Sequence, residues 1–266
     1  MRIGIFVISL ERAKRRRQYI QSHLQSLNLN FTVVDAIDGM LVDEDFLYSQ
    51  ADMERVRQSP YWLTKGALAC ALSHKNALDL FVDSHFDMAL ILEDDVVLPL
   101  SIKTLMSDIS EKISEYDIVL LYYAALRGAY LSKVGGINVV SGSLLYPMEL
   151  KQVSTSSAYI IGKEAARRMS SIIIPVSVAA DSWGHFYKHN CYNNVYLHYP
   201  MEVQTKDFKS SIEYFDGKFK SKLSSFIDTY RFPILYQLLR YKRKIFRKKI
   251  TSQIYLTNEI SPYCNR

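Results

Sequence analysis

Glu93, Asp94 and Asp95 are three consecutive carboxylates inside the otherwise apolar run Ala89–Leu98. A carboxylate in a dry core is costly unless it is paired, bound to a metal ion or placed at a strand end open to water. At the carboxyl end of a buried strand, the triplet would lie where open α/β sheets bind ligands. Hard oxygen ligands at that position suit Mg²⁺ or Mn²⁺, and such a cation suits a phosphorylated substrate. The alternative is an acidic turn between two strands.

The elements around the triplet alternate between strand and helix patterns over the first two-thirds of the chain. Strands are predicted at Ile3–Ile8, Phe31–Val34, Asp87–Leu92, Tyr116–Tyr123, Ser157–Ile161 and Asn194–His198. Helices are predicted at Glu11–Leu27, Lys65–Phe81 and Lys163–Ser170. This alternation predicts an α/β sheet covered by helices on both faces. Glycines and serines at 135–136 and 141–143 predict a polar, flexible connection between the fourth and fifth strands.

The composition is that of a chain with a substantial core, because 48% of its 266 residues are hydrophobic. Cys70, Cys191 and Cys264 lack metal-ligand spacing, so we predict neither a disulfide framework nor a zinc site and expect a reducing compartment. The apolar stretch near the N-terminus is shorter than a signal peptide's core or a membrane span, and it predicts a buried first strand.

Charge is distributed unevenly along the chain. Residues 218–249 contain eleven Lys or Arg and one acidic residue, about +10 by count, whereas residues 1–217 hold 21 basic and 25 acidic residues, close to −4. From Pro233 onward, apolar residues recur mostly at three- and four-residue steps, which predicts a basic amphipathic helix. We expect this basic C-terminal segment, residues 218–266, to lie on an anionic membrane surface. A helix packed on the body is the alternative, and nucleic-acid binding is not expected because few aromatic residues interleave the basic ones.

Several stretches, in order along the chain, resemble glycosyltransferase family 25, the bacterial lipooligosaccharide galactosyltransferases and their relatives. They are V-I-S-L-E-R-A-K-R-R (Val7–Arg16), D-A-I-D-G (Asp35–Gly39), K-G-A-L-A-C-A-L-S-H (Lys65–His74) and I-L-E-D-D-V (Ile91–Val96). Weaker matches follow at Ser157–Ile161 and from Pro175 to Asp181. Ala67 and Ala69 depart from the family pattern at the entrance of a predicted helix.

The resemblance implies a GT-A-like nucleotide-sugar-binding sheet flanked by helices over residues 1–217, with the basic C-terminal segment appended. It also implies a UDP-sugar donor, UDP-galactose first, and a Mn²⁺ or Mg²⁺ ion that neutralises the diphosphate leaving group. Asp95 and Glu93 are then the predicted metal ligands, and His198 is the third, at the end of a late strand. Asp94 is predicted to bind the donor; the alternative is that it only caps the turn.

Asp181 is the predicted general base for the attacking hydroxyl of the acceptor. It precedes Trp183, and an aromatic ring beside a carboxylate suits a sugar, because the ring covers the apolar face while the carboxylate meets a hydroxyl. The alternative is an aspartate that caps the next helix.

Asp35 and Asp38 follow the second predicted strand and would meet uridine or ribose hydroxyls. Arg12 and Lys65 are the predicted contacts for the diphosphate. His74 falls within a matching stretch but in the middle of a helix, where a structural role is equally compatible.

We therefore predict a metal-dependent inverting glycosyltransferase, a β-galactosyltransferase by family analogy, that transfers galactose from UDP-galactose to a terminal sugar of a lipooligosaccharide or lipopolysaccharide. We expect it in the cytoplasm, peripheral on the inner membrane of a bacterium, acting on the oligosaccharide of a glycolipid. The alternatives are transfer from UDP-glucose or UDP-N-acetylglucosamine, and a non-catalytic adaptor that binds membranes or nucleic acid through residues 218–266. A sugar nucleotidyltransferase is disfavoured because Val7–Arg16 has no glycine-rich phosphate loop.

Overall fold

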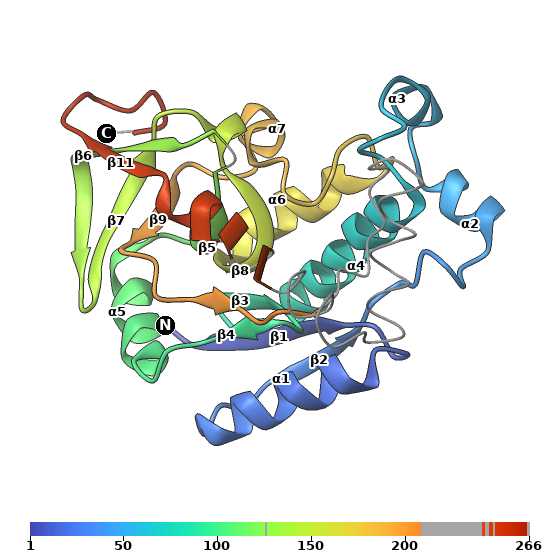
Figure 1. The fold of residues 1–266 in the computed structure, drawn as a ribbon, viewed down its shortest axis with the longest axis horizontal. Helices are drawn as coiled ribbons and strands as arrows, with labels where there is room; N and C mark the ends of the chain where they lie inside the picture. Colours follow the sequence, from blue (N-terminus) through green and yellow to red (C-terminus); the bar gives the residue numbers. More distant parts are fainter. Residues whose placement is uncertain (126, 209–240, 243–244, 247, 265–266) are drawn as a thin grey trace.

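The computed structural model describes residues 1–125, 127–208, 241–242, 245–246 and 248–264. These residues build a nine-stranded sheet with the order β11-β6-β7-β9-β5-β8-β3-β1-β2, and a small sheet of β10 and β4 (Figure 1). The strands are β1 (Ile3–Ser9), β2 (Thr32–Asp35), β3 (Met88–Glu93), β4 (Val96–Val97), β5 (Ile118–Ala124), β6 (Ala129–Val139), β7 (Gly142–Pro147), β8 (Ser154–Gly162), β9 (Val195–Tyr199), β10 (Gln204–Thr205) and β11 (Ile254–Thr257). The helices are α1 (Lys14–Ser26), α2 (Glu44–Ser49), α3 (Met53–Gln58), α4 (Lys65–Val82), α5 (Ile102–Lys112), α6 (Lys163–Ile173) and α7 (Trp183–Lys188), with a 3₁₀ turn at Leu150–Gln152.

Helices cover both faces of the sheet, as the alternating pattern predicted (Figure 1). On β3, Ala89 and Ile91 join the core that is shared with α4 and α6. Their neighbours Leu90 and Leu92 join the core on the opposite face, shared with α1 and α5. The long run of buried residues in β3 thus reflects a strand that is covered on both sides.

Three parallel strands at one side of the sheet bring their carboxyl ends together. β1 lies between β2 and β3 and is parallel to both. In the register of these pairs, Ser9 lies opposite Asp35 and Ile8 lies opposite Glu93. The acidic triplet therefore begins at the sheet edge where the loops after β1 and β2 also start, which is the usual ligand-binding edge of such sheets.

The predicted polar connection between the fourth and fifth strands is wrong. The chain there forms an antiparallel hairpin of β6 and β7, and β7 also pairs with β9. Its glycines allow close packing of backbone. A Cβ on Gly136 would lie 2.9 Å from the Leu145 side chain. Gly142 has φ +149°, and a Cβ there would overlap the Tyr199 carbonyl oxygen. Glycine in a strand can mark a close approach as well as a loop, and here it marks the former.

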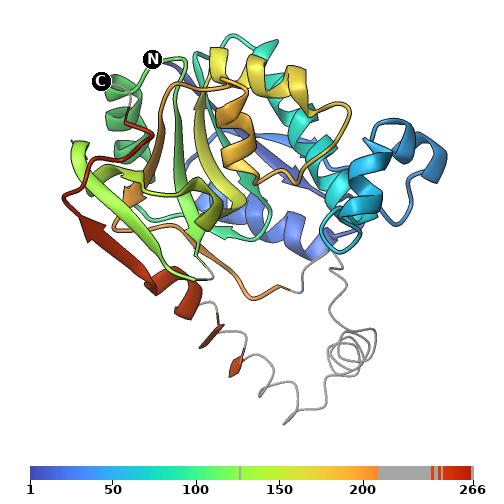
Figure 2. The ribbon, with the colours of Figure 1, turned by 90° about the horizontal axis from the view of Figure 1, so that it is seen from above.

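The last described residues return to the sheet, so part of the basic C-terminal segment belongs to its edge. β11 pairs in parallel with β6 (Figure 2). The Ser261 hydroxyl donates a hydrogen bond to the Pro147 carbonyl at 2.6 Å. The described residues between 241 and 252 are helical, with Tyr241 and Phe246 exposed. Most of the predicted basic helix lies outside the described residues, and its membrane attachment stays a prediction. Among the described residues, we find no helix with the length and apolar character needed to span a bilayer.

Gly162, the last residue of β8, provides a test of the packing between β8 and the loop before β5. A Cβ at Gly162 would overlap the backbone of Glu115. We expect Gly162→Ala to lower the free energy of unfolding by about 1–3 kcal/mol, because a backbone segment must shift to admit the methyl group. Urea unfolding followed by circular dichroism measures the loss.

Gly184→Ala is the matched control. Gly184 lies in α7, and its added Cβ would meet only Leu150 at 3.6 Å, an ordinary contact. We expect this variant to keep the wild-type stability or gain up to about 1 kcal/mol, since alanine restricts the unfolded chain and favours the helix. Equal losses in the two variants would contradict the packing described for Gly162.

Candidate active site

The acidic triplet is a tight turn at the carboxyl edge of the sheet. Glu93 ends β3, Asp94 and Asp95 form the turn, and β4 follows directly. β4 pairs with β10, and the Lys206 N–H donates to the Asp95 carbonyl at 2.7 Å. The sequence left two alternatives for the triplet, a turn between strands and a position at the ligand-binding edge of the sheet. In the structure, the turn itself lies at that edge.

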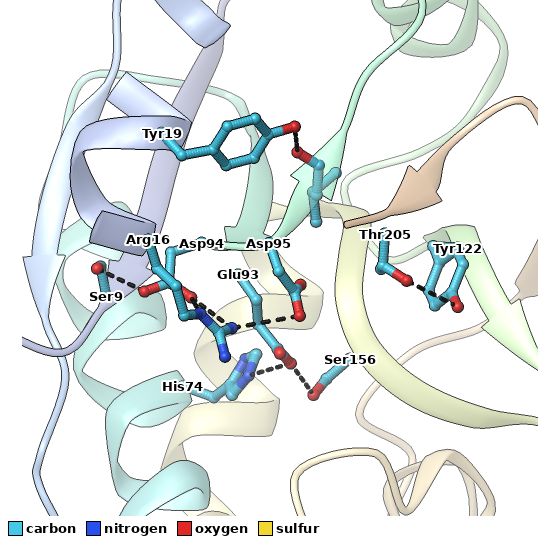
Figure 3. A network of polar contacts seen from close by, with 11 residues as sticks. Ser9, Arg16, Tyr19, His74, Glu93, Asp94, Asp95, Tyr122, Ser156 and Thr205 are labelled. Carbon is cyan, nitrogen blue, oxygen red and sulfur yellow. Dashed lines mark hydrogen bonds and ion pairs between the residues drawn. The ribbon is translucent and has the colours of Figure 1, made fainter. Parts of the chain in front are cut away.

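Asp94 is the most buried of the three carboxylates, with 7% of its side chain exposed. Its Oδ2 accepts a hydrogen bond from the Ser9 hydroxyl at 2.7 Å. Its Oδ1 accepts one from Arg16 Nε at 2.6 Å and lies 2.5 Å from Arg16 Nη2 (Figure 3). Both oxygens therefore hold protein groups, so the geometry suits Asp94 to anchoring Arg16 rather than to direct contact with a donor.

Asp95 shares the same guanidinium through a longer contact. Arg16 Nη2 lies 3.3 Å from Asp95 Oδ2 (Figure 3). The side chain of Asp95 is 20% exposed, about three times the fraction of Asp94. Of these two neighbours, Asp95 is thus the more accessible to a ligand.

Glu93 projects from the face of the sheet that α4 covers. Its Oε1 accepts a hydrogen bond from the Ser156 hydroxyl at 3.1 Å and lies 3.7 Å from His74 Nε2 (Figure 3). Burial raises the pKa of Glu93, but the contact with His74, together with the charge of Arg16 and the Ser156 hydrogen bond, outweighs it and leaves the pKa lowered. Glu93 is therefore an ionised carboxylate at neutral pH, with 28% of its side chain exposed.

His74 is a buried residue of this site that sequence reasoning did not select. Its Nδ1 lies 3.1 Å from the Tyr159 hydroxyl. Burial raises the pKa of Tyr159, so the hydroxyl stays protonated and can donate to Nδ1. A ring hydrogen on Nε2 then faces Glu93. The only signal in the sequence was its place in the stretch Lys65–His74, and helical periodicity does not distinguish it from a core histidine.

Asp181 and Glu93 are connected through two adjacent residues of β8 that bind them. The Thr155 N–H donates to Asp181 Oδ2 at 2.8 Å, and the next residue, Ser156, donates to Glu93. Asp181 is not the cap of α7, since Ser182 occupies that position. The carboxylate predicted as the base and the acidic triplet, 86 residues apart in the sequence, are thus linked through β8.

Trp183 does not have the predicted role. The ring is buried and packs edge-on against Tyr159, with ring centroids 5.4 Å apart. A buried indole has no face for an acceptor sugar. The residue supports the core below the site instead.

The loop after β2 is held against the start of α4. The Ile37 N–H donates to the Ser73 hydroxyl at 2.9 Å, and a Cβ on Gly39 would lie 2.8 Å from the Lys65 carbonyl oxygen. Asp38 pairs with Arg12 and also accepts the Met40 N–H at 3.0 Å. Burial raises the pKa of Asp38, but the Arg12 hydrogen bond and the Met40 N–H lower it overall.

Asp35 and Lys65 are more peripheral than the other predicted residues. Asp35 pairs with Arg17 at 2.6 Å, yet 75% of its side chain is exposed. Lys65 pairs with Glu44 of α2, which raises the pKa of the lysine. Among the described residues, the ion-pair partners of Asp35 and Lys65 lie outside the triplet, so their donor roles stay predictions.

His198 is not brought to the triplet. It is fully buried in β9, and neither ring nitrogen has a hydrogen-bond partner among the described residues. By strand alternation it projects with Tyr196 into the core on the α5 face, whereas Glu93 follows Ile91 on the α4 face. Burial lowers the pKa of His198. Its predicted role as a metal ligand has no support in this arrangement.

A divalent cation would have two accessible carboxylates at this site, Glu93 and Asp95. In the part of the chain that the structure describes, no group of three or more His, Cys, Asp or Glu side chains is arranged to hold a metal. Mg²⁺ in nucleotide enzymes is commonly bound by one or two carboxylates together with substrate phosphates and water. The donor set therefore fits a cation that arrives with a diphosphate, rather than one held in a protein cage.

Comparison with known proteins gives a family match over most of this region. The family model described as glycosyltransferase family 25 (LPS biosynthesis protein) matches residues 2–183. A putative glycosyltransferase of Haemophilus influenzae is 27% identical over 179 residues, which cover 66% of this chain and 61% of that protein.

Two human proteins are also similar. One, named inactive glycosyltransferase 25 family member 3, is 26% identical over 62% of this chain and 29% of its own length. The other, procollagen galactosyltransferase 2, is 28% identical over 46% of this chain and 21% of its own length. The chain thus aligns with less than two thirds of each of these three relatives, and one of them is named inactive.

Replacing His74 tests the buried contacts that join α4, β8 and Glu93. We expect His74→Leu to lower the free energy of unfolding by about 1–3 kcal/mol, because the Tyr159 hydroxyl and Glu93 each lose a polar partner in a buried site. Urea unfolding measures the loss.

His74→Gln is the control, since its amide can accept from Tyr159 and donate toward Glu93. We expect it to lose less than half as much stability as His74→Leu. A leucine variant as stable as the wild type would show that these contacts contribute nothing to the fold.

Proposed function

Because the chain belongs to glycosyltransferase family 25, we propose that it is a metal-dependent inverting glycosyltransferase that transfers galactose from UDP-galactose to a terminal sugar of a lipooligosaccharide or lipopolysaccharide. The observation that carries this proposal is the placement of three groups at one sheet edge. Glu93 and Asp95 supply accessible carboxylates, Arg16 supplies a cation beside them, and Asp181 joins them through β8.

The donor half of the reaction rests on Glu93 and Asp95. We propose that their oxygens hold Mn²⁺ or Mg²⁺ together with the diphosphate of the donor, while Asp94 keeps Arg16 in place. When bound, the cation neutralises the charge that develops on the diphosphate leaving group. His74 and Ser156 hold the Glu93 carboxylate in one orientation, so it needs little reorganisation when the donor arrives.

The acceptor half rests on Asp181. In an inverting transfer, one carboxylate takes the proton of the attacking hydroxyl while the leaving group departs on the opposite side of the sugar. The Thr155 N–H fixes one oxygen of Asp181 through a backbone hydrogen bond. We propose that the carboxylate of Asp181 receives this proton.

The nucleoside half of the donor is assigned to the loop after β2. We propose that Asp35 and Asp38 meet the ribose or uracil, and that Arg12 and Lys65 lie near the phosphates. The Arg12–Asp38 pair supports this, because it keeps the loop ordered beside the carboxyl end of β1. Arg12 and Asp38 would then act as one unit.

Galactose as the transferred sugar rests on analogy. One human relative is named a procollagen galactosyltransferase, and the family description names LPS biosynthesis. UDP-glucose and UDP-N-acetylglucosamine stay as alternative donors, since sugar selectivity depends on pocket shape. A non-catalytic role is the second candidate, because another human relative is named inactive.

We further propose that the protein acts at the cytoplasmic face of a bacterial inner membrane, on the oligosaccharide of a glycolipid. The eleven basic residues between 218 and 249 support attachment to anionic lipid. The exposed Tyr241, Ile245 and Phe246 add apolar side chains near that stretch.

The test of the proposal is a transfer assay with the full chain. We expect UDP release with Mn²⁺, UDP-galactose and a lipooligosaccharide acceptor, faster than with UDP-glucose or UDP-N-acetylglucosamine. A coupled UDP assay and mass spectrometry of the acceptor measure the product. Chelation by EDTA should abolish release, since the leaving group then loses its neutralising cation.

Asp95→Asn is the matched inactive control, because it removes the charge and keeps the shape. We expect its rate to fall by about 100-fold or more with an unchanged melting temperature. If the wild type releases no UDP from any donor and modifies no glycan, the non-catalytic alternative replaces the proposal.

Asp181→Asn tests the base separately from the donor site. We expect kcat to fall by about 10²–10⁴-fold, because an amide cannot take the proton, while UDP affinity with Mn²⁺ stays within about twofold. Steady-state kinetics and calorimetry measure the two quantities. Asp83→Asn, at the exposed end of α4, is the control and should keep wild-type kinetics. An Asp181→Asn variant with nearly full kcat would remove Asp181 as the base.

A further inference from the structure

Arg16 contacts two of the three carboxylates of the acidic triplet, and the proposed mechanism assigns it no role in binding the cation or the nucleotide. It lies on the first turn of α1, and only 14% of its side chain is exposed. Its guanidinium lies between Asp94 and Asp95 (Figure 3). The guanidinium thus already places a positive charge beside Asp95. A divalent cation bound to Asp95 would add further positive charge at the same place.

The two contacts of Arg16 are unequal. Asp94 Oδ1 is approached by both Nε and Nη2, at 2.6 and 2.5 Å, while the distance from Nη2 to Asp95 Oδ2 is 3.3 Å. Charge-assisted hydrogen bonds are shortest when they are strong, so Asp94 is the firm anchor and Asp95 the weaker partner. The contact with Asp95 can therefore be exchanged while the anchor is kept.

The surroundings restrict how far Arg16 can move. The Phe208 ring lies on the guanidinium, with its centroid 5.8 Å from Cζ. The segment that carries Phe208 is held to the triplet, because the Lys206 N–H donates to the Asp95 carbonyl. A stacked and anchored guanidinium can shift slightly while it stays beside the turn.

We propose that Arg16 couples the binding of the cation to the binding of the donor's diphosphate, an inference that rests on the proposed function. In the free protein, Arg16 pairs with Asp95 and opposes a cation there. When a nucleoside diphosphate arrives, the guanidinium exchanges its contact with Asp95 for the diphosphate, and the Asp95 carboxylate is released to the cation. Arginine suits this exchange because its planar fork can hold Asp94 and a phosphate together.

This coupling has a thermodynamic consequence. If the diphosphate strengthens cation binding by some factor, the cation strengthens diphosphate binding by the same factor. The exchange at Arg16 contributes part of that factor. Loss of the Arg16 guanidinium should tighten cation binding to the free protein and weaken binding of the nucleotide. These two effects have opposite signs.

The experiment compares Arg16→Gln with the wild type, using Mn²⁺ alone, UDP alone and both together. We expect Arg16→Gln to bind Mn²⁺ about three- to tenfold more tightly without nucleotide, because the competing charge is gone. We expect its affinity for UDP at saturating Mn²⁺ to fall about tenfold or more, because a charge-assisted contact is lost. Electron paramagnetic resonance of free Mn²⁺ and isothermal titration calorimetry measure the two affinities.

Arg15→Gln is the matched control, since it removes the same charge from the next, exposed position of α1. It should leave both affinities within about twofold, because surface charges in salt act weakly. Similar shifts in the two variants would show a general charge effect and overturn the proposal. Mn²⁺ affinity that falls or stays unchanged in Arg16→Gln would also overturn it, and would leave Arg16 as a group that only holds the turn.

Arg16→Gln leaves the buried Asp94 without its guanidinium, so the double variant Arg16→Gln/Asp94→Asn is measured beside it. The double variant keeps the net charge, and its two amides can still bond each other and Ser9. We expect it to show the same loss of UDP affinity at saturating Mn²⁺ as Arg16→Gln, with a melting temperature closer to that of the wild type. A wild type that binds no UDP with Mn²⁺ would overturn the proposed function together with this coupling. If the wild type binds both Mn²⁺ and UDP, and both Arg16 variants bind them with the wild-type affinities, the coupling alone is overturned.

Discussion

Three adjacent carboxylates at the edge of an apolar sheet must each be compensated, and this requirement ties the surrounding elements together. Asp94 is bound by Ser9 of β1 and Arg16 of α1. Glu93 is bound by Ser156 of β8 and faces His74 of α4. Asp95 shares Arg16, and its carbonyl holds the chain that follows β10. Each carboxylate thus fixes a different part of the fold, and removal of one partner would leave charge in a partly dry site.

The position of the triplet was predictable from sequence, because it depends on local pattern. Apolar runs marked β1, β3 and β8, and the triplet interrupted one such run. Parallel pairing of β1 with its neighbours then placed the strand ends together. Asp181 was selected because it precedes Trp183 in a stretch that weakly matches the family, and no local pattern connects it to Glu93.

Other features of the fold and the site could not be predicted from the sequence. They depend on which distant segments pair and on which face of the sheet a side chain projects from. His198 lies in a late strand as predicted, although the strand ends at Tyr199, and alternation along β9 sends His198 to the face opposite Glu93. The glycines at 135–136 suggested a loop but lie within the β6–β7 hairpin. Mid-helix periodicity describes His74 as core, and only the packing of α4 against β3 and β8 makes it a partner of Glu93.

The link between Glu93 and Asp181 explains an unusual backbone conformation. Thr155 has φ +80°, which is rare for a β-branched residue and costs about 1–3 kcal/mol. Such strain persists only where neighbouring contacts determine it, and here the Thr155 N–H is bound by Asp181 while the Ser156 side chain is bound to Glu93. In this conformation, consecutive residues reach two carboxylates, one at the end of β3 and one in the loop before α7. The carboxylates proposed for the donor and acceptor halves are therefore both held by the same two residues of β8, and a relaxed backbone at Thr155 would disturb both contacts.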